Sequence, residues 1–337
     1  MEAQRKEYLW AWEDLERAVR ERYQETDLAL VRRAYDYAKA AHEGQKRYTG
    51  TPYVVHPTAT AVRLAEMKLP IEVVVAGLLH DVPEDTAHTL EEVRAEFGDD
   101  VAEMVRGVTK LGKVKYRGIE RYAENLRRMF LAMAEDVRVV FIKFADRLHN
   151  VETLFARPQS KQERLAKEVL EIYAPIAARL GMGEMKGRLE DGAFEYAYPE
   201  AYKQAVALFD ENIHIREDDI EHTITETKNI LVEAGVTAFD IKGRKKFLYS
   251  FWQKLQRYHG DVSQIYDLVA IRIIVQDVAD CYAVLGILHA HWPPLKGRIK
   301  DYIAQPKPNG YQSLHTTVFD EHCGIVEFQI RTREMHD

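Results

Sequence analysis

The sequence predicts an α+β protein of two domains, in which an all-helical domain precedes a domain of helices and strands. Its 337 residues exceed the size at which a single hydrophobic core usually stops growing, about 250–300 residues. Apolar residues recur at helical spacing as far as about Tyr196, whereas β-branched and alternating segments follow Gly235. We therefore expect the boundary between Tyr196 and Val236.

Periodic apolar positions and capping signals predict the helices. Residues 26–42 carry one apolar stripe, formed by Leu28, Val31, Ala34, Tyr35 and Ala38. Thr89 and Glu92 have capping-box spacing, and Gly98 closes the helix that they begin. A largely buried helix is expected over 134–154. Helices then continue to about Lys228, with a break at the glycines of 181–187.

The end of the most apolar run, Val73–Leu79, combines one imidazole with concentrated negative charge. A histidine and three carboxylates follow the run within six residues: His80, Asp81, Glu84 and Asp85. Proline disfavours helical geometry in the residue before it, so Pro83 predicts that the helix ends or kinks at Val82. The first two polar residues would then lie in its last turn, and the other two just past the break.

Strand signals dominate the C-terminal part. Residues 267–275 are β-branched and bounded by turn signals, and 311–319 are expected to form a further strand. Residues 324–332 alternate, which places Val326, Phe328 and Ile330 on one face and Glu327, Gln329 and Arg331 on the other. A helix over 249–258 is expected to be capped by Ser250 and Gln253.

Composition excludes several classes of protein. The charged first residues lack the apolar core of a signal peptide, and no apolar run is long enough to span a membrane. The two cysteines fit no metal or disulfide spacing, which favours the cytoplasm. No Walker loop occurs, so the standard P-loop chemistry is excluded.

Charge is unevenly distributed. The net charge is −7, yet Ile241–Tyr311 carries eleven Lys/Arg and only five Asp/Glu residues. A basic segment inside an acidic protein indicates either a pocket for a polyanion or a solvated basic face.

The first candidate site is a metal centre. Two histidines and two carboxylates can hold a divalent metal and leave positions open for water and substrate. His80 and Asp81 supply two of these ligands, and His56 and Asp146 are candidates for the others. Asp146 shares a polar helical stripe with three further residues: His149, Asn150 and Thr153.

These motifs resemble those of a known family. The His…His-Asp…Asp pattern is similar to that of the HD superfamily of metal phosphohydrolases. The longer blocks "AHEGQKRYTGTPYVVHP", "GLLHDVPEDT", "VTKL" and "FIKFADRLHNVETL" resemble the hydrolase domain of the bifunctional Rel/SpoT alarmone enzymes. The resemblance implies Mn2+-dependent removal of pyrophosphate from the 3′ position of (p)ppGpp.

The resemblance also implies roles for residues. The implied Mn2+ ligands are His56, His80, Asp81 and Asp146. Glu84 and Asp85 match the catalytic acidic pair, which would orient or deprotonate the attacking water. The implied nucleotide contacts of the hydrolase site are Lys46, Arg47, Tyr48, His149, Asn150 and Thr153.

The basic segment resembles the synthetase domain of the same family. "IYDLVAIRIIV", "KDYIAQPKPNGYQSLHTTV" and "EFQIRTREMHD" occur in the family's order. The resemblance implies a nucleotidyltransferase-like domain with a mixed sheet, which transfers pyrophosphate from ATP to the 3′-hydroxyl of GDP or GTP. Asp267 would bind Mg2+, Glu327 would be a second Mg2+ ligand or activate the 3′-hydroxyl, and Tyr311 would stack on guanine. The other implied nucleotide contacts are Arg244, Lys246, Ser250, Lys254, Arg272, Arg298, Lys300, Lys307, Asn309, Gln312, His315 and Gln329.

The expected organisation is a hydrolase domain over 1–196, a helical connector over 197–235 and a synthetase domain over 236–337. Arg298 and Lys300 match the pattern of the bifunctional branch. The family continues into C-terminal regulatory domains, so contact with the ribosome and uncharged tRNA is expected only through domains absent from this sequence. An RNA-acting nucleotidyltransferase and a non-catalytic nucleotide sensor remain alternatives.

Overall fold

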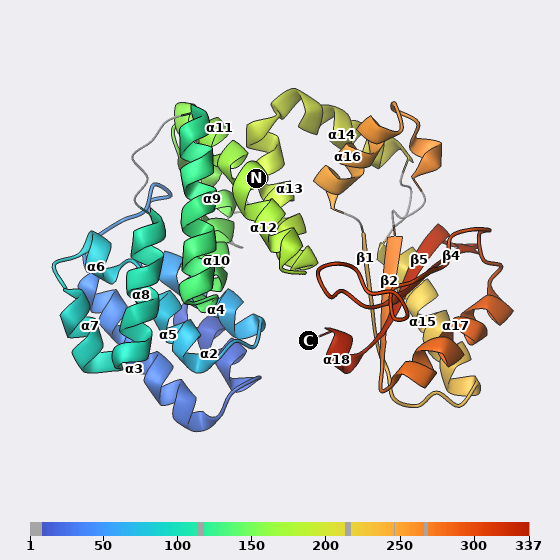
Figure 1. Cartoon of the computed structure of the whole chain (residues 1–337), viewed down its shortest axis with the longest axis horizontal. Coiled ribbons are helices and arrows are strands. Elements are labelled where there is room, and N and C mark those ends of the chain that lie inside the picture. The colour runs from blue at the N-terminus through green and yellow to red at the C-terminus, as the bar shows by residue number, and fades with distance from the viewer. Residues whose placement is uncertain (1–8, 113–117, 213–216, 246, 266–268, 337) are drawn as a thin grey trace. The chain divides into compact units, whose positions relative to one another are not determined.

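The computed structural model describes residues 9–112, 118–212, 217–245, 247–265 and 269–336 (Figure 1). The chain divides into two compact units, Met1–Ala177 and Ala178–Asp337. This division groups the helices after Ala178 with the sheet. The functional limits at 196 and 235 remain predictions.

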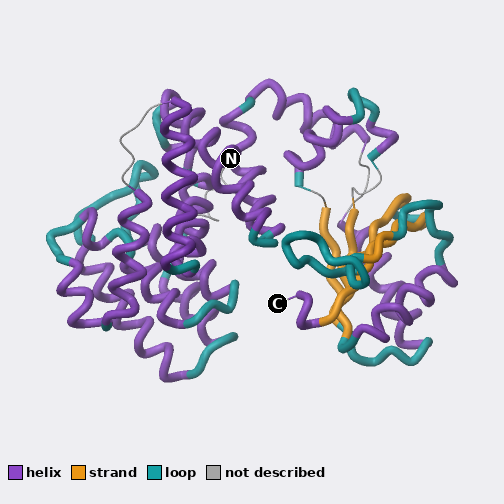
Figure 2. The backbone as a smooth tube through the Cα atoms, viewed as in Figure 1, coloured by secondary structure: helices purple, strands orange, loops and turns teal. Residues whose placement is uncertain are grey.

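The described part of the first unit consists of helices (Figure 2). They are α2 (Trp12–Arg20), α3 (Glu25–Ala41), α4 (Val55–Glu66), α5 (Ile71–Leu79), α6 (Val82–Asp85), α7 (Leu90–Phe97), α8 (Asp99–Gly112), α9 (Gly118–Glu135), α10 (Arg138–Glu152), η1 (Leu154–Ala156), α11 (Gln159–Glu168) and the π-helix η2 (Val169–Tyr173). Helix α12 (Ala174–Arg179) contains the division between the units.

Burial follows the predicted patterns. All five apolar stripe residues of α3 are buried. Thr89 and Glu92 form the predicted capping box of α7, and Gly98 ends this helix with a φ of +90°. Helices α4, α5 and α10 are buried along most of their length. In α5, every residue from Val73 to Leu79 is buried, which explains why this run shows no polar face.

The predicted effect of Pro83 is wrong. Helix α5 ends at Leu79, with His80 as its C-cap, three residues before Val82. Val82 is itself helical and begins the single turn α6, in which Pro83 occupies the second position. Proline is tolerated in a first helical turn because the backbone N–H groups there have no intrahelical acceptor. Glu84 and Asp85 therefore lie on a short helix of their own.

The second unit combines helices with one sheet (Figure 2). Its elements are α13 (Gly183–Ala197), α14 (Pro199–Asn212), α15 (Glu217–Glu233), β1 (Asp240–Lys245), α16 (Leu248–Arg257), η3 (Val262–Gln264), β2 (Val269–Val275), α17 (Val278–His291), β3 (Lys300–Asp301), β4 (Leu314–Asp320), β5 (Gly324–Thr332) and α18 (Arg333–His336). The predicted helical stretch thus extends five residues beyond Lys228.

The sheet is mixed, in the order β1-β2-β5-β4-β3. Strand β5 runs parallel to β2, and the other neighbouring strands are antiparallel. Helices α15 and α17 cover one face of the sheet (Figure 1), where Val326, Phe328 and Ile330 are fully buried in a common core. Polar side chains of β2, β4 and β5 occupy the opposite face. The predicted α+β architecture is confirmed.

The predicted cap of α16 is wrong. The helix begins at Leu248, so Ser250 and Gln253 lie inside it. The carboxylate of Asp191, in α13, instead accepts hydrogen bonds from the backbone N–H groups of Leu248 and Tyr249, at 3.0 and 2.8 Å. A residue 57 positions from Leu248 therefore supplies the cap. Among the described residues, no helix is long and apolar enough to cross a membrane.

Candidate metal centre and nucleotide sites

Three residues from three elements of the first unit converge on one point. His56 lies in the first turn of α4, His80 at the end of α5 and Asp146 in α10, and they are 1%, 1% and 4% exposed. One ligand atom from each lies within 4.8 Å of the others. Asp81 lies beside this group, with its carboxylate 3.1 Å from His80 Nε2 and 3.5 Å from His56 Nε2. The four predicted ligands are therefore neighbours.

The hydrogen bonds of His80 indicate that the group suits a cation. His80 Nδ1 lies 2.8 Å from the carbonyl oxygen of Gly77, which can only accept, so Nδ1 carries the proton. In the neutral ring, Nε2 then presents a lone pair toward the Asp81 carboxylate. This atom is buried and has no hydrogen-bond partner among the described residues. A divalent metal would bind both the lone pair and the carboxylate, and two imidazoles with two carboxylates are a fitting donor set.

The protonation states also suit a metal. Burial, reinforced by the charge of Arg47, lowers the pKa of His56 to about 4, so its imidazole is neutral at pH 7. Burial opposes ionisation of Asp146, but the ammonium of Lys143, 2.8 Å away, together with His56 and Arg147, outweighs it and holds the pKa of this carboxyl well below its usual value. A neutral imidazole and an ionised carboxylate are the ligand forms that metals require.

The acidic pair lies at the rim of this centre. Asp85 and Glu84 are exposed on α6. The hydroxyl of Tyr53 lies 2.6 Å from Asp85 Oδ2 and 2.9 Å from Asp81 Oδ2, and it therefore joins Asp85 to the metal group. Gln45 holds the same turn by donating to the Asp85 carbonyl oxygen at 2.7 Å.

The predicted nucleotide contacts of the hydrolase separate into two layers. His149 is buried behind His56, with their Nδ1 atoms 2.8 Å apart, and Thr153 donates to the His149 carbonyl oxygen. Asn150 donates to Asp146 and accepts from Arg47 Nη2 at 2.8 Å. Nearer the surface, Lys46 and Tyr48 are exposed.

Sequence reasoning missed two residues of this site. Tyr53 stands in the quoted segment before His56, and Lys143 precedes Asp146 by one helical turn. The i, i+3 spacing of Lys143 and Asp146 could have indicated their ion pair. Nothing local indicates that Tyr53 reaches Asp81 and Asp85, because that contact depends on how α4, α5 and α6 pack.

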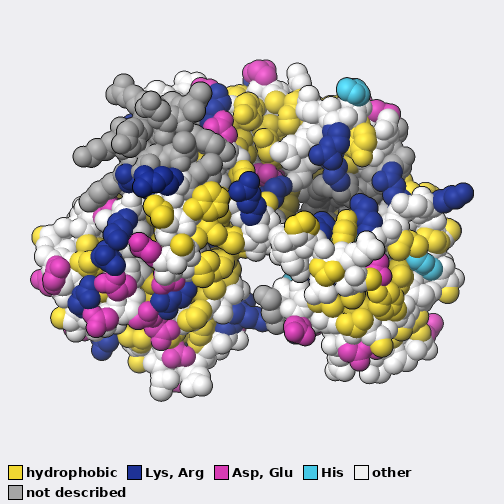
Figure 3. All heavy atoms as spheres, viewed as in Figure 1, with side chains coloured by type: hydrophobic (Ala, Val, Ile, Leu, Met, Phe, Trp, Pro, Cys, Tyr) yellow, Lys and Arg dark blue, Asp and Glu magenta, His cyan; other side chains and the backbone are white. Residues whose placement is uncertain are grey.

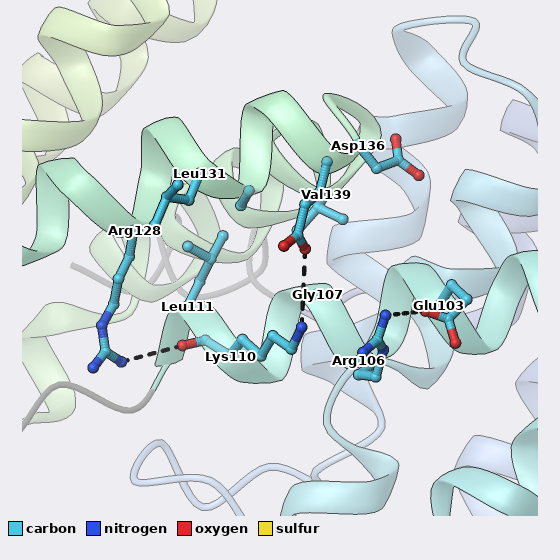
Figure 4. Close-up of a pocket in the computed structure, with 11 residues that line it drawn as sticks. Glu103, Arg106, Gly107, Lys110, Leu111, Arg128, Leu131, Asp136 and Val139 are labelled. Atoms are coloured by element: carbon cyan, nitrogen blue, oxygen red, sulfur yellow. Dashed lines mark hydrogen bonds and ion pairs between the residues drawn. The ribbon is translucent and has the colours of Figure 1, made fainter.

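A cavity of the first unit lies apart from the predicted hydrolase residues. It measures about 800 Å³ and is lined from α8, α9 and α10 (Figure 4). Its cations have nearby partners: Lys110 lies 3.9 Å from Glu135, and Arg106 pairs with Glu103. None of the predicted hydrolase residues lines this cavity.

In the second unit, four predicted synthetase residues form a chain of hydrogen bonds on the open face of the sheet. Glu327 Oε1 lies 3.1 Å from His315 Nδ1, and the Tyr311 hydroxyl lies 2.8 Å from His315 Nε2. Gln329 donates to Glu327 Oε2 at 3.0 Å. Because a carboxylate can only accept, His315 donates to Glu327 from Nδ1, and the Tyr311 hydroxyl continues the chain at Nε2.

Two further elements bring basic groups to this face. Arg272 of β2 is paired in register with Gln329 of β5. A turn places Lys307 Nζ 5.0 Å from the centre of the Tyr311 ring, and Gly310 has the positive φ, +78°, that the turn requires. Within this turn, Asn309 Oδ1 accepts from the Tyr311 backbone N–H at 3.2 Å.

The remaining synthetase predictions are less tightly grouped. Gln312 donates to the Ile303 carbonyl oxygen, and Ser250 hydrogen-bonds the Glu190 carboxyl. Lys300 is paired in register with His315, and Arg298 follows the Gly297 turn. Lys254 is a half-buried residue of α16. Asp267, Lys246 and the side chain of Arg244 lie outside the described residues.

The charges on the face of the helical unit drawn in Figure 3 argue against a broad nucleic-acid-binding surface there. In the view of Figure 3, Lys and Arg side chains of the helical unit are interspersed with Asp and Glu side chains. Nucleic-acid surfaces gather cations on one face. The described side chains of the helical unit that are visible in this view form no such cationic surface.

Both parts of the chain match known protein families. Residues 34–183 match the family described as an HD domain, and residues 243–337 match the region found in RelA and SpoT proteins. The guanosine-3′,5′-bis(diphosphate) 3′-pyrophosphohydrolase of Aquifex aeolicus is 45% identical over 326 residues, which cover 96% of this chain and 46% of the relative.

Two other relatives carry names that refer to synthesis. The GTP pyrophosphokinase of Streptomyces coelicolor is 48% identical over 309 residues, covering 92% of this chain and 36% of the relative. The bifunctional (p)ppGpp synthase/hydrolase SpoT of Escherichia coli is 44% identical over 332 residues, covering 97% and 47%. The chain thus spans less than half the length of each of these three relatives.

A helical HD domain with a buried His/His/Asp group, followed by a mixed-sheet domain, defines the class of this two-domain chain. The match to the HD domain precedes the match to the RelA/SpoT region along the chain. The chain therefore combines an HD domain with the region found in RelA and SpoT proteins.

Proposed function

We propose that the chain is a bifunctional alarmone enzyme that hydrolyses (p)ppGpp at one site and synthesises it at another. The observation that carries the hydrolytic assignment is the buried group of His56, His80 and Asp146, in which His80 Nε2 has no hydrogen-bond partner within the described part of the chain. Relatives named as hydrolase, as pyrophosphokinase and as both support the pairing of activities.

At the hydrolytic site, Mn2+ would be held by His56, His80, Asp81 and Asp146. When bound, it would lower the pKa of a coordinated water and polarise the 3′-pyrophosphate. Glu84 and Asp85 would orient this water or accept its proton, and Tyr53 holds Asp85 in place. Water replaces the 3′-oxygen at the phosphorus next to the ribose, so the products are GDP or GTP and pyrophosphate.

The nucleotide would lie beside this centre. Arg47 and Asn150, which are hydrogen-bonded to each other, would contact it, together with Lys46, Tyr48 and Thr153. His149 supports the ligand His56 from behind.

At the synthetic site, the 3′-oxygen of GDP or GTP would attack the β-phosphorus of ATP. The new bond joins this oxygen to the β-phosphorus, and the bond from that phosphorus to the α-phosphate oxygen breaks to release AMP. Glu327 is the candidate for accepting the 3′-hydroxyl proton or for binding Mg2+ together with Asp267. Tyr311 would stack on guanine, and Arg272 and Lys307 would contact phosphates.

Two variants test the assignment by separating the activities. His80→Ala should abolish Mn2+-dependent hydrolysis of ppGpp and leave synthesis from ATP and GDP within about twofold of wild type, because the altered group lies only in the first site. Glu327→Gln should abolish synthesis and leave Mn2+-dependent hydrolysis within about twofold of wild type. Loss of both activities in either variant, with the fold intact by circular dichroism, would contradict two independent sites.

A further inference from the structure

His42 is a buried histidine at the end of α3 whose ring makes a single hydrogen bond. It is the C-cap residue of this helix and is 3% exposed. Its Nδ1 lies 2.9 Å from Gln45 Oε1, whereas its Nε2 is buried and has no hydrogen-bond partner within the described ranges. Leaving a buried ring nitrogen unpaired costs free energy, so the position of this ring calls for an explanation.

The hydrogen bond of His42 continues to the turn that carries the acidic pair. Gln45 Nε2 donates to the Asp85 carbonyl oxygen at 2.7 Å. A carbonyl oxygen can only accept, so the amide nitrogen of Gln45 faces Asp85 and its amide oxygen faces His42. The imidazole must therefore donate from Nδ1. Two hydrogen bonds in series thus run from His42 through Gln45 to the backbone of α6.

A second contact of the same ring reaches Asp85 by another route. His42 stacks on Tyr53, with ring centroids 4.4 Å apart and an angle of 16° between the ring planes. The Tyr53 hydroxyl donates to the Asp85 carboxylate at 2.6 Å. The backbone and the side chain of Asp85 are therefore supported by different partners, and both partners contact His42.

The loop between these residues connects the two partners to each other. The backbone N–H of Gln45 donates to the His42 carbonyl oxygen, and the N–H of Tyr53 donates to the Gln45 carbonyl oxygen, each at 3.0 Å. Lys46 and Pro52 form an antiparallel bridge within the loop. Gln45 and Tyr53 are thus parts of one closed loop, and the His42 ring contacts both of their side chains.

We propose that His42 is a positioning residue for hydrolysis, which fixes Asp85 through Gln45 and Tyr53. The inference rests on the proposed function, because it assumes that Asp85 acts on the attacking water. Asp85 lies on the single turn α6, in which Val82 is the buried residue. A turn with so little buried surface needs outside contacts to hold a carboxylate in a productive position.

Two variants separate the two contacts of the ring. His42→Phe keeps a ring to stack on Tyr53 but has no donor for Gln45, and it should lower kcat for ppGpp hydrolysis about tenfold. His42→Asn keeps a donor in place of Nδ1 and should lose less than His42→Phe. In both variants, KM and the Mn2+ dissociation constant should stay within about twofold of wild type, because no predicted ligand or nucleotide contact is removed.

His88→Phe is the matched control, because His88 packs against Tyr37 and lies 3.2 Å from its hydroxyl, outside this series of hydrogen bonds. Its kcat should stay within about twofold of wild type. An unchanged kcat in His42→Phe, or an equal loss in His88→Phe, would overturn the inference.

A double-mutant cycle tests whether His42 acts through Gln45. Gln45→Met keeps the length of the side chain and removes both of its hydrogen bonds. If the two residues act in series, adding His42→Phe to Gln45→Met should lower kcat by no more than about twofold further. Losses that multiply in the double variant would show independent effects and overturn the proposed route.

Amide hydrogen exchange tests the positioning without catalysis or metal. The backbone N–H groups of Asp85 and Thr86 donate across the α6 turn, to the carbonyl oxygens of Asp81 and Val82. In metal-free protein, His42→Phe should speed exchange at these two amides about tenfold and leave the amides of α7 unchanged. Unchanged exchange in α6 would overturn the inference. If the wild-type protein does not hydrolyse ppGpp, the proposed function fails, and this exchange result alone decides whether His42 holds the turn.

Discussion

At the residue scale, the hydroxyl of Tyr53 lies between two carboxylates, 2.9 Å from Asp81 Oδ2 and 2.6 Å from Asp85 Oδ2. His42 stacks on the Tyr53 ring, with centroids 4.4 Å apart, and restricts its rotation. Burial raises the pKa of Tyr53, and the charges of Asp81 and Asp85 act in the same direction. The hydroxyl therefore stays protonated and acts as a hydrogen-bond donor. The position of Asp85 is thereby linked to that of Asp81.

Tyr53→Phe should lower kcat for ppGpp hydrolysis about tenfold and change Mn2+ affinity much less. The variant removes a hydrogen bond to an ionised group, typically about 1.5–3 kcal/mol, but no predicted metal ligand. Measuring kcat together with the Mn2+ dissociation constant separates these effects. Tyr23→Phe, which removes a hydroxyl hydrogen bond to Leu69 away from the site, is the control. Equal loss of kcat in both variants would contradict a positioning role for Tyr53.

Residue types were more predictable than their contacts. His80 and Asp81 are adjacent in the sequence, and the polar stripe of α10 indicated Asp146 and Asn150. The contact between His56 and Asp146, at 3.3 Å, joins residues 90 positions apart. No local pattern specifies such a contact. The metal group could therefore be predicted only from the order of the family motifs along the sequence.

At the element scale, the start of α16 depends on Asp191 of α13. Asp191→Ala should lower the free energy of unfolding of the second unit by about 1–2 kcal/mol, because two backbone N–H groups lose their acceptor. Urea denaturation measures this change. Ser250→Ala, at a position inside the helix, is the control for a predicted cap that the structure does not have. A larger loss in Ser250→Ala than in Asp191→Ala would contradict this assignment.

Glu190, the neighbour of Asp191, provides a test by pH. Burial raises the pKa of Glu190 despite hydrogen bonds from Lys186 and Ser250. The folded protein therefore holds this proton at pH values where the unfolded chain, with a pKa of about 4.3, has lost it. Stability from this residue is present at low pH and is lost as pH rises through the raised pKa.

The stability of wild type relative to Glu190→Gln should consequently fall between pH 5 and pH 8. Glutamine keeps the shape of the side chain but does not titrate. Urea denaturation of both proteins at the two pH values measures the difference. A relative gain in wild-type stability at pH 8 would show that Lys186 and Ser250 outweigh burial.

The elements also show where sequence prediction succeeds and fails. Strand β5 has the predicted bounds, because its strict alternation matches one buried and one polar face. The capping box of α7 was predictable because both partners lie within four residues. The cap of α16 and the end of α5 were not, because a tertiary contact and a proline at an allowed helical position decided them.

At the scale of the whole molecule, the two compact units each have a core, and the predicted Mn2+ ligands all lie in the first. Mn2+ at a hundred times its dissociation constant should stabilise that unit by about 2.7 kcal/mol, a shift of roughly 5–10 °C in its unfolding temperature. Calorimetry should show this shift in one transition only. His80→Ala should remove it, and an equal shift in that variant would contradict the assigned ligands.

The most direct test is incubation of the purified protein with ppGpp, with and without Mn2+, followed by anion-exchange separation of the nucleotides. The proposed function predicts release of GDP and pyrophosphate that requires Mn2+ and disappears when the metal is chelated. Failure to release either product from protein shown by calorimetry to have bound Mn2+ would contradict the assignment of the buried histidine and aspartate group as a hydrolytic centre.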